Sequence, residues 1–375
     1  MDQIIGERES RKNVIEKIKR EYDIAVLHEE SENRIIFSTQ DNGTFSVLEL
    51  ASCVAAMHRN PPAASAGRLP CMADIERVET NLISAVPAKE EHRNEDMAEK
   101  LISSALAYQN QMQVPVCLVE GADFFGKFGF EYIYDRPRYT LNTETITLEM
   151  LARASRGESV SLDIPDMTLQ AVTQEDMLSL AHFVNARLCR QYGFFVIRRA
   201  AYYEQLQERL LRSGGNLFQI MESGIRKGYF ICTDTAAGST GEVVFDQAFD
   251  RECYLLTEKG KSPAVMARIV NMPEMLRHVA GNGKITIAIR LSDPVIAEND
   301  GLFIWYIDEQ GSRMERVEEP ETGKESDSPD SSMRPEVTTT IGAFTAFLFA
   351  YTKLKQNAKF DSIYLAGPAF VNEIF

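Results

Sequence analysis

The sequence of 375 residues has no apolar run that approaches the ~20 residues needed to span a bilayer. Its first residues show no basic segment followed by an apolar stretch, which is the pattern of a signal peptide. We therefore expect a cytoplasmic protein that makes no membrane contact. A chain of this length is typical of two or three domains.

Cysteine and histidine are too scattered to indicate a metal site. The six cysteines have no CxxC spacing, and several of them lie in apolar runs, as Cys117 does. This distribution is typical of reduced thiols in a protein core rather than of disulfides or zinc ligands. The five histidines form no H-x-x-x-H or H-E-x-x-H pattern. The sequence therefore predicts no bound metal.

Basic residues are fewer than acidic ones: the chain has 40 Lys and Arg and 55 Asp and Glu, which give a net charge of −15. Nucleic acid is thus an unfavourable main partner, since phosphate binding needs basic patches. The negative charge favours cationic ligands, although it is as typical of a protein that needs charge only for solubility. The acid-rich stretch 315–332 is expected to form a mobile surface loop.

The order of apolar patterns predicts alternating strands and helices, which indicates an α/β or α+β fold. Strand-like sequence begins at Ile24, and Ser155–Pro165 has the composition of a linker. Helices are predicted over 9–22, 96–111, 175–190, 200–211, 273–279 and 342–354. Strands are predicted over 81–86, 114–119, 217–222, 228–234, 284–291 and 301–308.

The last ten residues are mostly apolar and end on Ile374 and Phe375. Burial of Phe375 would also bury its α-carboxylate, which must then be paired or have a raised pKa. A carboxylate with a raised pKa is suited to act as a general base near neutral pH. The alternative is a C-terminal strand whose carboxylate lies at the rim of a sheet.

Four segments, taken in order, resemble the Eis (enhanced intracellular survival) family of the GNAT acetyltransferase superfamily. The resemblance covers residues 77–375 and is carried by Phe124–Leu141, Asn185–Arg198, Met266–Pro273 and the ending Ala366–Phe375. It implies an N-terminal GNAT domain over 1–155, a central GNAT-like domain over 166–264, and an α+β domain like sterol carrier proteins over 265–375. We expect each domain to have its own sheet, with boundaries near 155–165 and 261–265.

The resemblance implies an acetyl-CoA-dependent N-acetyltransferase that acts on a cationic amine, either a small molecule or a Lys-bearing peptide. It also implies a homo-oligomer, with a hexamer as the family's form. In that family the chain end is threaded into the first domain, where the terminal carboxylate is the general base, and Phe375 matches this position. The family's general-acid tyrosine matches Phe125, which lacks the hydroxyl.

The resemblance also implies a cofactor site. Pantetheine would lie along Ser84, Ala85 and Val86, and the pyrophosphate would lie against Arg93, Asn94, Asp96, Met97 and Ala98. The family has glycines where this chain has Asn94 and Asp96. Asp96 suits a helix N-cap, but it would repel a phosphate by ~1 kcal/mol or more. We therefore expect weak binding of acetyl-CoA, and the alternative function is a catalytically impaired GNAT-fold protein that binds a ligand or supports an assembly.

Two tyrosines follow Phe125 closely. On a regular strand Tyr132 and Tyr134 would face the same side. One of them could replace the missing hydroxyl, or both could pack in the core. In the third domain, an apolar helix face is expected to belong to the core rather than to a lipid site; it consists of Phe344, Phe347, Leu348 and Tyr351.

Overall fold

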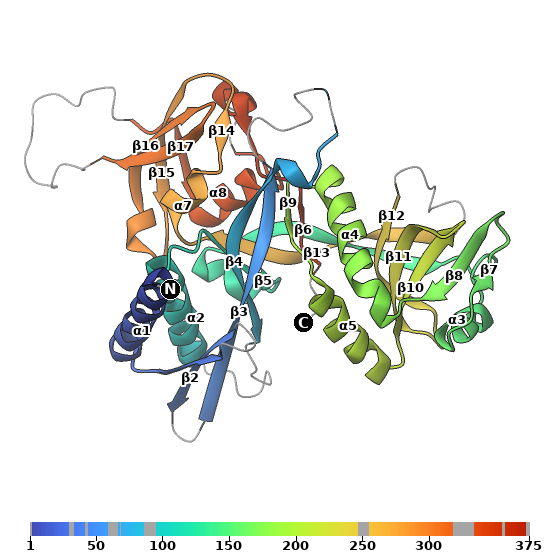
Figure 1. Ribbon diagram of the computed structural model, residues 1–375. Helices are drawn as coiled ribbons and strands as arrows, with labels where there is room; N and C mark the ends of the chain where they lie inside the picture. The colour runs from blue at the N-terminus through green and yellow to red at the C-terminus, as the bar shows by residue number, and fades with distance from the viewer. Residues whose placement is uncertain are drawn as a thin grey trace, which may run out of the picture.

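The computed structural model describes residues 2–29, 34–41, 44–58, 67, 69–85, 95–246, 255–317, 334–354 and 357–372. These residues form one long mixed sheet of 14 strands, a separate sheet of four strands, a two-stranded pair and flanking helices (Figure 1). The mixed α/β composition agrees with the fold class expected from the sequence.

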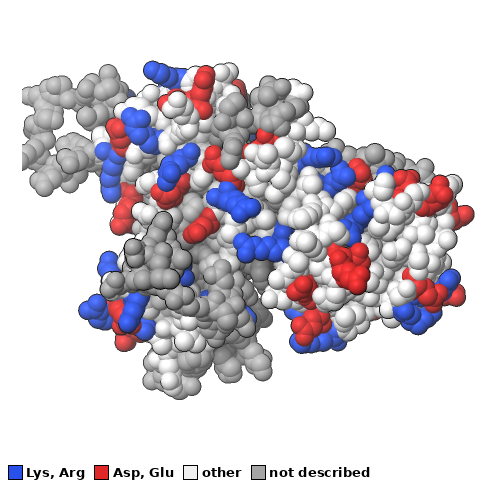
Figure 2. All heavy atoms as spheres, viewed as in Figure 1, with Lys and Arg blue, Asp and Glu red and all other residues white. Residues whose placement is uncertain are grey.

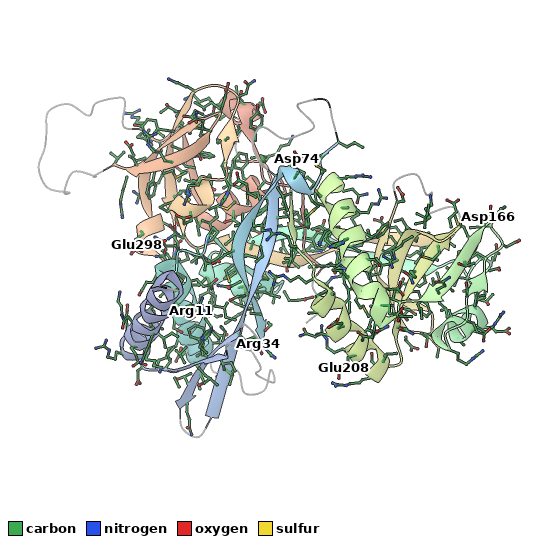
Figure 3. All side chains as sticks on the ribbon, viewed as in Figure 1. Arg11, Arg34, Asp74, Asp166, Glu208 and Glu298 are labelled. Carbon is green, nitrogen blue, oxygen red and sulfur yellow. The ribbon has the colours of Figure 1, made fainter. Side chains whose placement is uncertain are left out.

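The N-terminal region begins with a helix and continues as an antiparallel meander. Its elements are α1 (Asp2–Tyr22), β1 (Ala25–Glu29), β2 (Arg34–Asp41), β3 (Thr44–His58), η2 (Met72–Asp74), β4 (Ile75–Ala85), α2 (Glu95–Gln111), β5 (Val116–Glu120), η4 (Asp123–Phe128), β6 (Glu131–Leu141) and α3 (Leu148–Ser155). The apolar positions at helical spacing place Ile18 of α1 and Leu101 of α2 in a common core with the sheet. Arg11 of α1, which is labelled in Figure 3, also contacts the ring of His28 in β1 at 3.1 Å.

The central region adds strands and two long helices to the same sheet. Its elements are β7 (Val160–Ser161), β8 (Met167–Ala171), η5 (Gln174–Asp176), α4 (Met177–Gln191), β9 (Phe194–Val196), α5 (Ala200–Arg212), β10 (Asn216–Glu222), β11 (Ile225–Asp234), β12 (Ser239–Phe245) and β13 (Leu256–Ile269). In Figure 1, α4 and α5 lie between the N-terminal strands and the outer strands β10–β12.

The expectation of separate sheets in the first two domains is wrong. The strand order is β1-β2-β3-β4-β5-β13-β6-β12-β11-β10-β8-β7, so β6 of the N-terminal region pairs directly with β12 of the central region. The strand β13 also runs through the expected boundary at 261–265 and lies between β5 and β6. The two regions can share one sheet because β6 and β13 are long. One end of β13 pairs with β5 of the N-terminal region, and the far end of β6 pairs with β12 of the central region.

The C-terminal region forms its own four-stranded sheet, in the order β17-β16-β15-β18. Its elements are α7 (Met272–Leu276), β14 (Ala280–Gly281), β15 (Ile285–Ser292), η6 (Ala297–Asn299), β16 (Gly301–Asp308), β17 (Gly311–Arg316), β18 (Val337–Thr340), α8 (Ile341–Leu348), η8 (Ala358–Ser362), β19 (Ile363–Tyr364) and β20 (Ala369–Phe370). Helix α8 packs on this sheet through Phe344, whose ring lies 5.3 Å from Trp305. Phe347 and Leu348 are buried too, which confirms the core interpretation for these residues of the apolar face.

Several composition-based expectations can be checked on the described residues. Cys117, Cys189 and Cys232 are buried, and burial raises the pKa of Cys117 to about 12. Cys71 is exposed, so the expectation of core thiols is wrong there: it precedes the short turn η2. Acidic and basic side chains are interspersed on the face shown in Figure 2. No helix in the described ranges is long and apolar enough to cross a membrane. Most of the acidic stretch 315–332 lies outside the described residues.

Candidate active site

One irregularity in the long sheet lies where the pairing of β4 with β5 ends. The two strands pair in parallel as far as Ile83 and Val119, and in the described part of the chain this pairing goes no further. At the same point the register between β4 and β3 shifts, which leaves Ser84 as the extra residue of a β-bulge. The hydroxyl of Ser84 is buried and has no hydrogen-bond partner among the described residues. Among the described residues, the β5-facing backbone edge of β4 is therefore unpaired at Ser84 and Ala85.

The start of α2 follows this edge along the chain. The helix begins at Glu95, so Asp96 lies in the first turn and is not the N-cap that the sequence suggested. Met97 and Ala98 are buried in the core, while Glu95 and Asp96 are exposed. That Ser84, Ala85 and the start of α2 together form a cofactor site stays a prediction. The remaining predicted cofactor residues, Val86, Arg93 and Asn94, lie outside the described residues.

One cation lies opposite the acidic start of α2. The Nζ atom of Lys127 lies 3.8 Å from a carboxylate oxygen of Glu95 and 3.6 Å from one of Glu99. It also lies 4.6 Å from the ring centroid of Phe124. A phosphate bound at this helix start would have to compete with both glutamates for Lys127, which is consistent with the expected weak cofactor binding.

Phe125 lies in an aromatic cluster rather than in a polar one. Its side chain is 8% exposed, and its ring packs edge-on against Phe124 at 5.6 Å and against Phe130 at 5.7 Å. Neither neighbour has a hydroxyl. A proton donor for chemistry at this end of the sheet must therefore come from another residue.

The two tyrosines of β6 do not face the same side, so that expectation is wrong. Three residues of β6, centred on Ile133, face two residues of β13, which makes Ile133 the extra residue of a β-bulge. Tyr132 consequently packs against the cluster that contains Phe125. Tyr134 packs on the opposite side of the sheet, where its ring lies 5.3 Å from that of Phe370.

The hydroxyl of Tyr134 has no hydrogen-bond partner among the described residues, although the side chain is only 6% exposed. Burial, together with the nearby carboxylate of Glu242, raises the pKa of Tyr134 far above its usual value. The phenol therefore stays protonated at ordinary pH. It is a buried donor whose partner, if one exists, must be a ligand, a water molecule or an undescribed residue.

The C-terminal segment reaches this side of the sheet. Strand β20 pairs in parallel with β9, which in turn pairs with β3. The ring of Phe370 lies 5.0 Å from Tyr192 and 5.6 Å from the guanidinium carbon of Arg198. Main-chain pairing and aromatic packing together fix this segment between the N-terminal and central regions.

Asn372, the last described residue, is 3% exposed and links the two regions by its side chain. Its Oδ1 accepts a hydrogen bond from Nε of Arg136 at 2.7 Å, and its Nδ2 donates to Glu242 at 3.0 Å. Arg136 also contacts Glu120 at the end of β5, at 2.9 Å. Polar contacts thus run from the end of β5 to the interior of the central region.

The buried end of this chain of contacts is an ion pair. Arg198 donates to both carboxylate oxygens of Glu242, and both side chains are at most 1% exposed. The hydroxyl of Tyr229 also donates to Glu242. Nη1 of Arg198 lies 3.3 Å from the hydroxyl oxygen of Tyr203. The carboxylate is therefore well supplied with donors, as a buried charge requires.

Sequence reasoning did not single out most of these residues. Arg198 and Asn372 fall within segments that resemble the Eis family, so a signal existed for them. Glu242 has no local pattern that would reveal its contacts, because Arg198 and Asn372 are 44 and 130 residues away in the chain. Arg136 falls within the segment Phe124–Leu141, but its partner Asn372 is 236 residues away. Phe375 lies outside the described residues, so its role as a general base stays a prediction.

Comparison with known proteins adds structural neighbours. No protein-family model and no curated protein matches this sequence. The fold is similar to that of a probable N-acyltransferase of unknown function from Enterococcus faecalis V583, with a TM-score of 0.61 and 15% identity over 92% of this chain and 90% of that chain. A GCN5-related N-acetyltransferase from Anabaena variabilis has a TM-score of 0.58, 15% identity, and coverage of 92% and 90%.

Eis1 from Mycobacterium abscessus is also similar, with a TM-score of 0.56 and 11% identity over 91% of this chain and 89% of that chain. At these identities the likeness establishes the fold. The chain therefore has the fold of GCN5-related N-acetyltransferases, as the resemblance predicted. The likeness of the last region to sterol carrier proteins stays a prediction.

Proposed function

We propose that this protein is an acetyl-CoA-dependent N-acetyltransferase whose acceptor is a cationic amine, either a small molecule or a Lys-bearing peptide. The observation that carries the proposal is the divergence of β4 from β5 after Ile83, with a β-bulge and an unpartnered hydroxyl at Ser84. An unused strand edge inside a sheet is suited to a ligand that carries amide groups, as pantetheine does.

The cofactor would lie between this edge and the start of α2. Its amides would hydrogen-bond the backbone of Ser84 and Ala85, and its pyrophosphate would approach the amides of the first turn of α2. Glu95, Asp96 and Glu99 disfavour that phosphate, and Lys127 is the cation that would exchange its glutamate partners for it. Binding of acetyl-CoA is therefore weak in this proposal.

The acceptor would approach from the side of the sheet that carries Tyr134 and the C-terminal segment. Transfer moves the acetyl group from sulfur to the amine nitrogen, the amine loses a proton to a base, and the thiolate gains a proton. Tyr134 is a protonated, unpartnered hydroxyl on that side, and we assign to it the donor role that Phe125 cannot fill. The terminal carboxylate of Phe375 is the proposed base, as the resemblance implies, and a hexamer is the proposed assembly.

Calorimetric titration with acetyl-CoA tests the cofactor site. The double change Asn94→Gly with Asp96→Gly should tighten binding, because it removes a repulsive charge and lets the backbone approach the phosphates. Asp166→Gly is a matched control: it removes one charge at an exposed position whose φ of +61° suits glycine. Submicromolar affinity of the unmodified chain, or equal tightening by the control, would contradict this view of the α2 start.

A catalytically impaired GNAT-fold protein is the second candidate. It is favoured by the lack of a hydroxyl on Phe125 and on its ring neighbours Phe124 and Phe130. The two candidates differ in turnover rather than in binding. Release of free CoA thiol from acetyl-CoA, measured with a panel of polyamines and Lys-bearing peptides, separates them. Binding of acetyl-CoA without thiol release for any amine would favour the impaired protein.

A further inference from the structure

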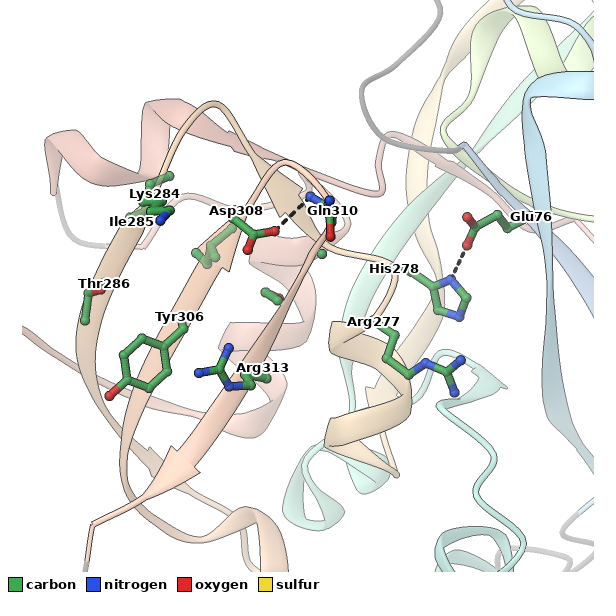
Figure 4. Close-up of a pocket in the computed structure, with 13 residues that line it drawn as sticks. Glu76, Arg277, His278, Lys284, Ile285, Thr286, Tyr306, Asp308, Gln310 and Arg313 are labelled. Atoms are coloured by element: carbon green, nitrogen blue, oxygen red, sulfur yellow. Dashed lines mark hydrogen bonds and ion pairs between the residues drawn. The ribbon is translucent and has the colours of Figure 1, made fainter.

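A second site lies on the C-terminal region, at the far end of β4 from Ser84. A cavity of about 690 Å³ opens between the sheet β15–β17, the end of α7 and Glu76 of β4 (Figure 4). Its size is within the range of small-molecule sites. Figure 4 shows Arg277, His278 and Glu76 on one side and Tyr306, Asp308 and Arg313 on the other.

The two acids that line the cavity are already engaged. Glu76 contacts Nδ1 of His278 at 2.7 Å, an ion pair when the imidazole is protonated. A carboxylate oxygen of Asp308 accepts a hydrogen bond from the backbone N–H of Gln310 at 2.8 Å, within the turn between β16 and β17. Each of the two carboxylates therefore has one polar partner among the described residues.

The two arginines of the lining form exposed ion pairs. Arg277 pairs with Glu274 three residues away, and Arg313 contacts Glu315 on its own strand at 3.1 Å. The guanidinium of Arg313 also lies 4.8 Å from the ring centroid of Tyr306, which holds it over one wall of the cavity. Exposed ion pairs contribute only ~0–1 kcal/mol, so a multiply charged anion can replace them.

Lys284 is the third cation of the lining, and it is exposed. No carboxylate in the described part of the chain pairs with it. Three cations, from the C-cap of α7, from β17 and from the turn before β15, thus line one concave surface of a protein whose net charge is −15. The lining itself has one more cation than carboxylate, while Glu274 and Glu315, the exposed partners of the two arginines, lie outside it. A lining with more cations than carboxylates favours small anions.

We infer that this cavity binds a small molecule with at least two negative charges, such as a phosphorylated or polycarboxylated metabolite. Lys284, Arg277 and Arg313 are its proposed ligand contacts. The site is separate from the proposed acetyl-CoA site, so it stands or falls independently of the transferase activity.

Two probes test the inference on the full-length protein: pyrophosphate for the phosphorylated class and citrate for the polycarboxylated class. Calorimetric titration at constant ionic strength should show binding of at least one, and the tighter one identifies the class. The double change Lys284→Gln with Arg313→Gln should weaken that binding ~10-fold or more, since it removes two charge-assisted contacts. Both side chains are exposed, so the fold should tolerate the change.

A matched control is Arg153→Gln with Arg212→Gln, which removes the same charge from exposed positions on α3 and α5. Its affinity for the probe should stay within twofold of the unmodified protein. A further control is Lys127→Gln, which would weaken binding of the probe only if the anion binds at the start of α2 instead of in the cavity. The inference fails if neither probe binds, if either control weakens binding as much as the cavity variant, or if spermidine binds the cavity better than both anions do.

Discussion

Arg268 and Arg198 are both buried, but the first is held largely by the backbone and the second by side chains. Arg268 pairs with Asp293 at 2.5 Å and donates to the carbonyl oxygens of Phe128 and Ile269. Arg198 pairs with Glu242, and its other contacts include the hydroxyl oxygens of Tyr203 and Tyr229. Burial lowers the pKa of Arg268, and Asp293 opposes that shift.

The difference assigns the two pairs different structural roles. The Arg268 pair links Asp293 of the C-terminal region to the end of η4. Apart from Asp293, the acceptors named for Arg268 are backbone carbonyl oxygens. The Arg198 pair depends on side chains from β9–α5, β11, β12 and the C-terminal segment, including Asn372. We infer that the first pair stabilises the whole fold, whereas the second also sets the position of the C-terminal segment at the proposed active site.

The largest expected effect follows from breaking the backbone-held pair. Asp293→Ala leaves the Arg268 charge buried without a carboxylate, so the free energy of unfolding should fall by ~3–5 kcal/mol. Urea denaturation measures this loss. Glu298→Ala, an exposed change in the neighbouring turn η6, should alter stability by less than ~0.5 kcal/mol. A loss below ~1 kcal/mol for Asp293→Ala would remove the proposed role of the pair.

We expect a smaller loss of stability at Glu242, because several side chains donate hydrogen bonds to its carboxylate. Tyr229→Phe removes one donor to Glu242 and keeps the ring, while Arg198 and Asn372 still donate to that carboxylate. The loss of a hydrogen bond to a charged group is worth ~1.5–3 kcal/mol. Urea denaturation should therefore place this variant between Asp293→Ala and the unmodified protein. A loss as large as that of Asp293→Ala would show that the two networks do not differ in this way.

The position of the C-terminal segment gives a local test. Asn372→Ala removes one acceptor of Arg136 and one donor to Glu242, while Arg136 keeps Glu120 and Glu242 keeps Arg198 and Tyr229. A lost hydrogen bond to a charged group costs ~1.5–3 kcal/mol. Amide hydrogen exchange in β20 should accelerate, while exchange in the core strands β15 and β16 should stay unchanged. Uniform acceleration across the protein would mean that Asn372 only supports global stability.

The tyrosines around Arg198 predict a loss of stability in alkali. Burial raises the pKa values of Tyr203 and Tyr229 above the usual value of 10. The free energy of unfolding that these two tyrosines contribute is fully present below pH 10. It is lost as the pH rises towards the folded-state pKa, because in that range only the unfolded chain loses the phenol proton. Each tyrosine should cost up to ~1.4 kcal/mol per pH unit in that window.

Urea denaturation at pH 9 and pH 11 measures this alkaline loss. Tyr203→Phe should lose less stability than the unmodified protein does between the two pH values. An exposed-surface control, Arg153→Gln, should keep the full loss. Identical losses in all three proteins would place the alkaline sensitivity elsewhere in the fold.

The smallest expected effect on stability is a gain rather than a loss. Tyr134→Phe removes a buried hydroxyl that has no partner among the described residues, so stability should stay constant or rise by up to ~1 kcal/mol. The same change should lower the rate of acetyl transfer ~10²-fold or more if the hydroxyl is the proton donor. Tyr132→Phe, from the other side of the sheet, should leave the rate within twofold. A destabilised Tyr134→Phe variant would reveal a structural hydrogen bond instead.

Local sequence patterns predicted much of the fold correctly. The helices at 96–111, 175–190 and 200–211 lie within one or two residues of α2, α4 and α5. The apolar positions Phe344, Phe347 and Leu348 belong to the core, as their helical spacing suggested. The resemblance also predicted the acetyltransferase fold. The helices and the buried face of α8 follow from residue spacing along the chain, which periodicity reports directly.

The site was predicted less completely, because its geometry depends on strand register. A β-bulge at Ile133 sends Tyr132 and Tyr134 to opposite sides of the sheet, and no local pattern marks the bulge. The insertion of β13 between β5 and β6 joins two expected domains into one sheet. Both outcomes depend on pairing with residues more than 100 positions away.

By itself, the sequence determined which segments are helical or extended, which residues supply the core, and that the hydroxyl expected at Phe125 is missing. Only the tertiary structure decided that Asn372 lies between Arg136 and Glu242, and that Tyr134 is a buried hydroxyl without a described partner. The physical reason is that a polar side chain becomes stable inside a protein only through partners that folding brings to it. Local composition shows where such a residue stands in the chain but does not reveal those partners.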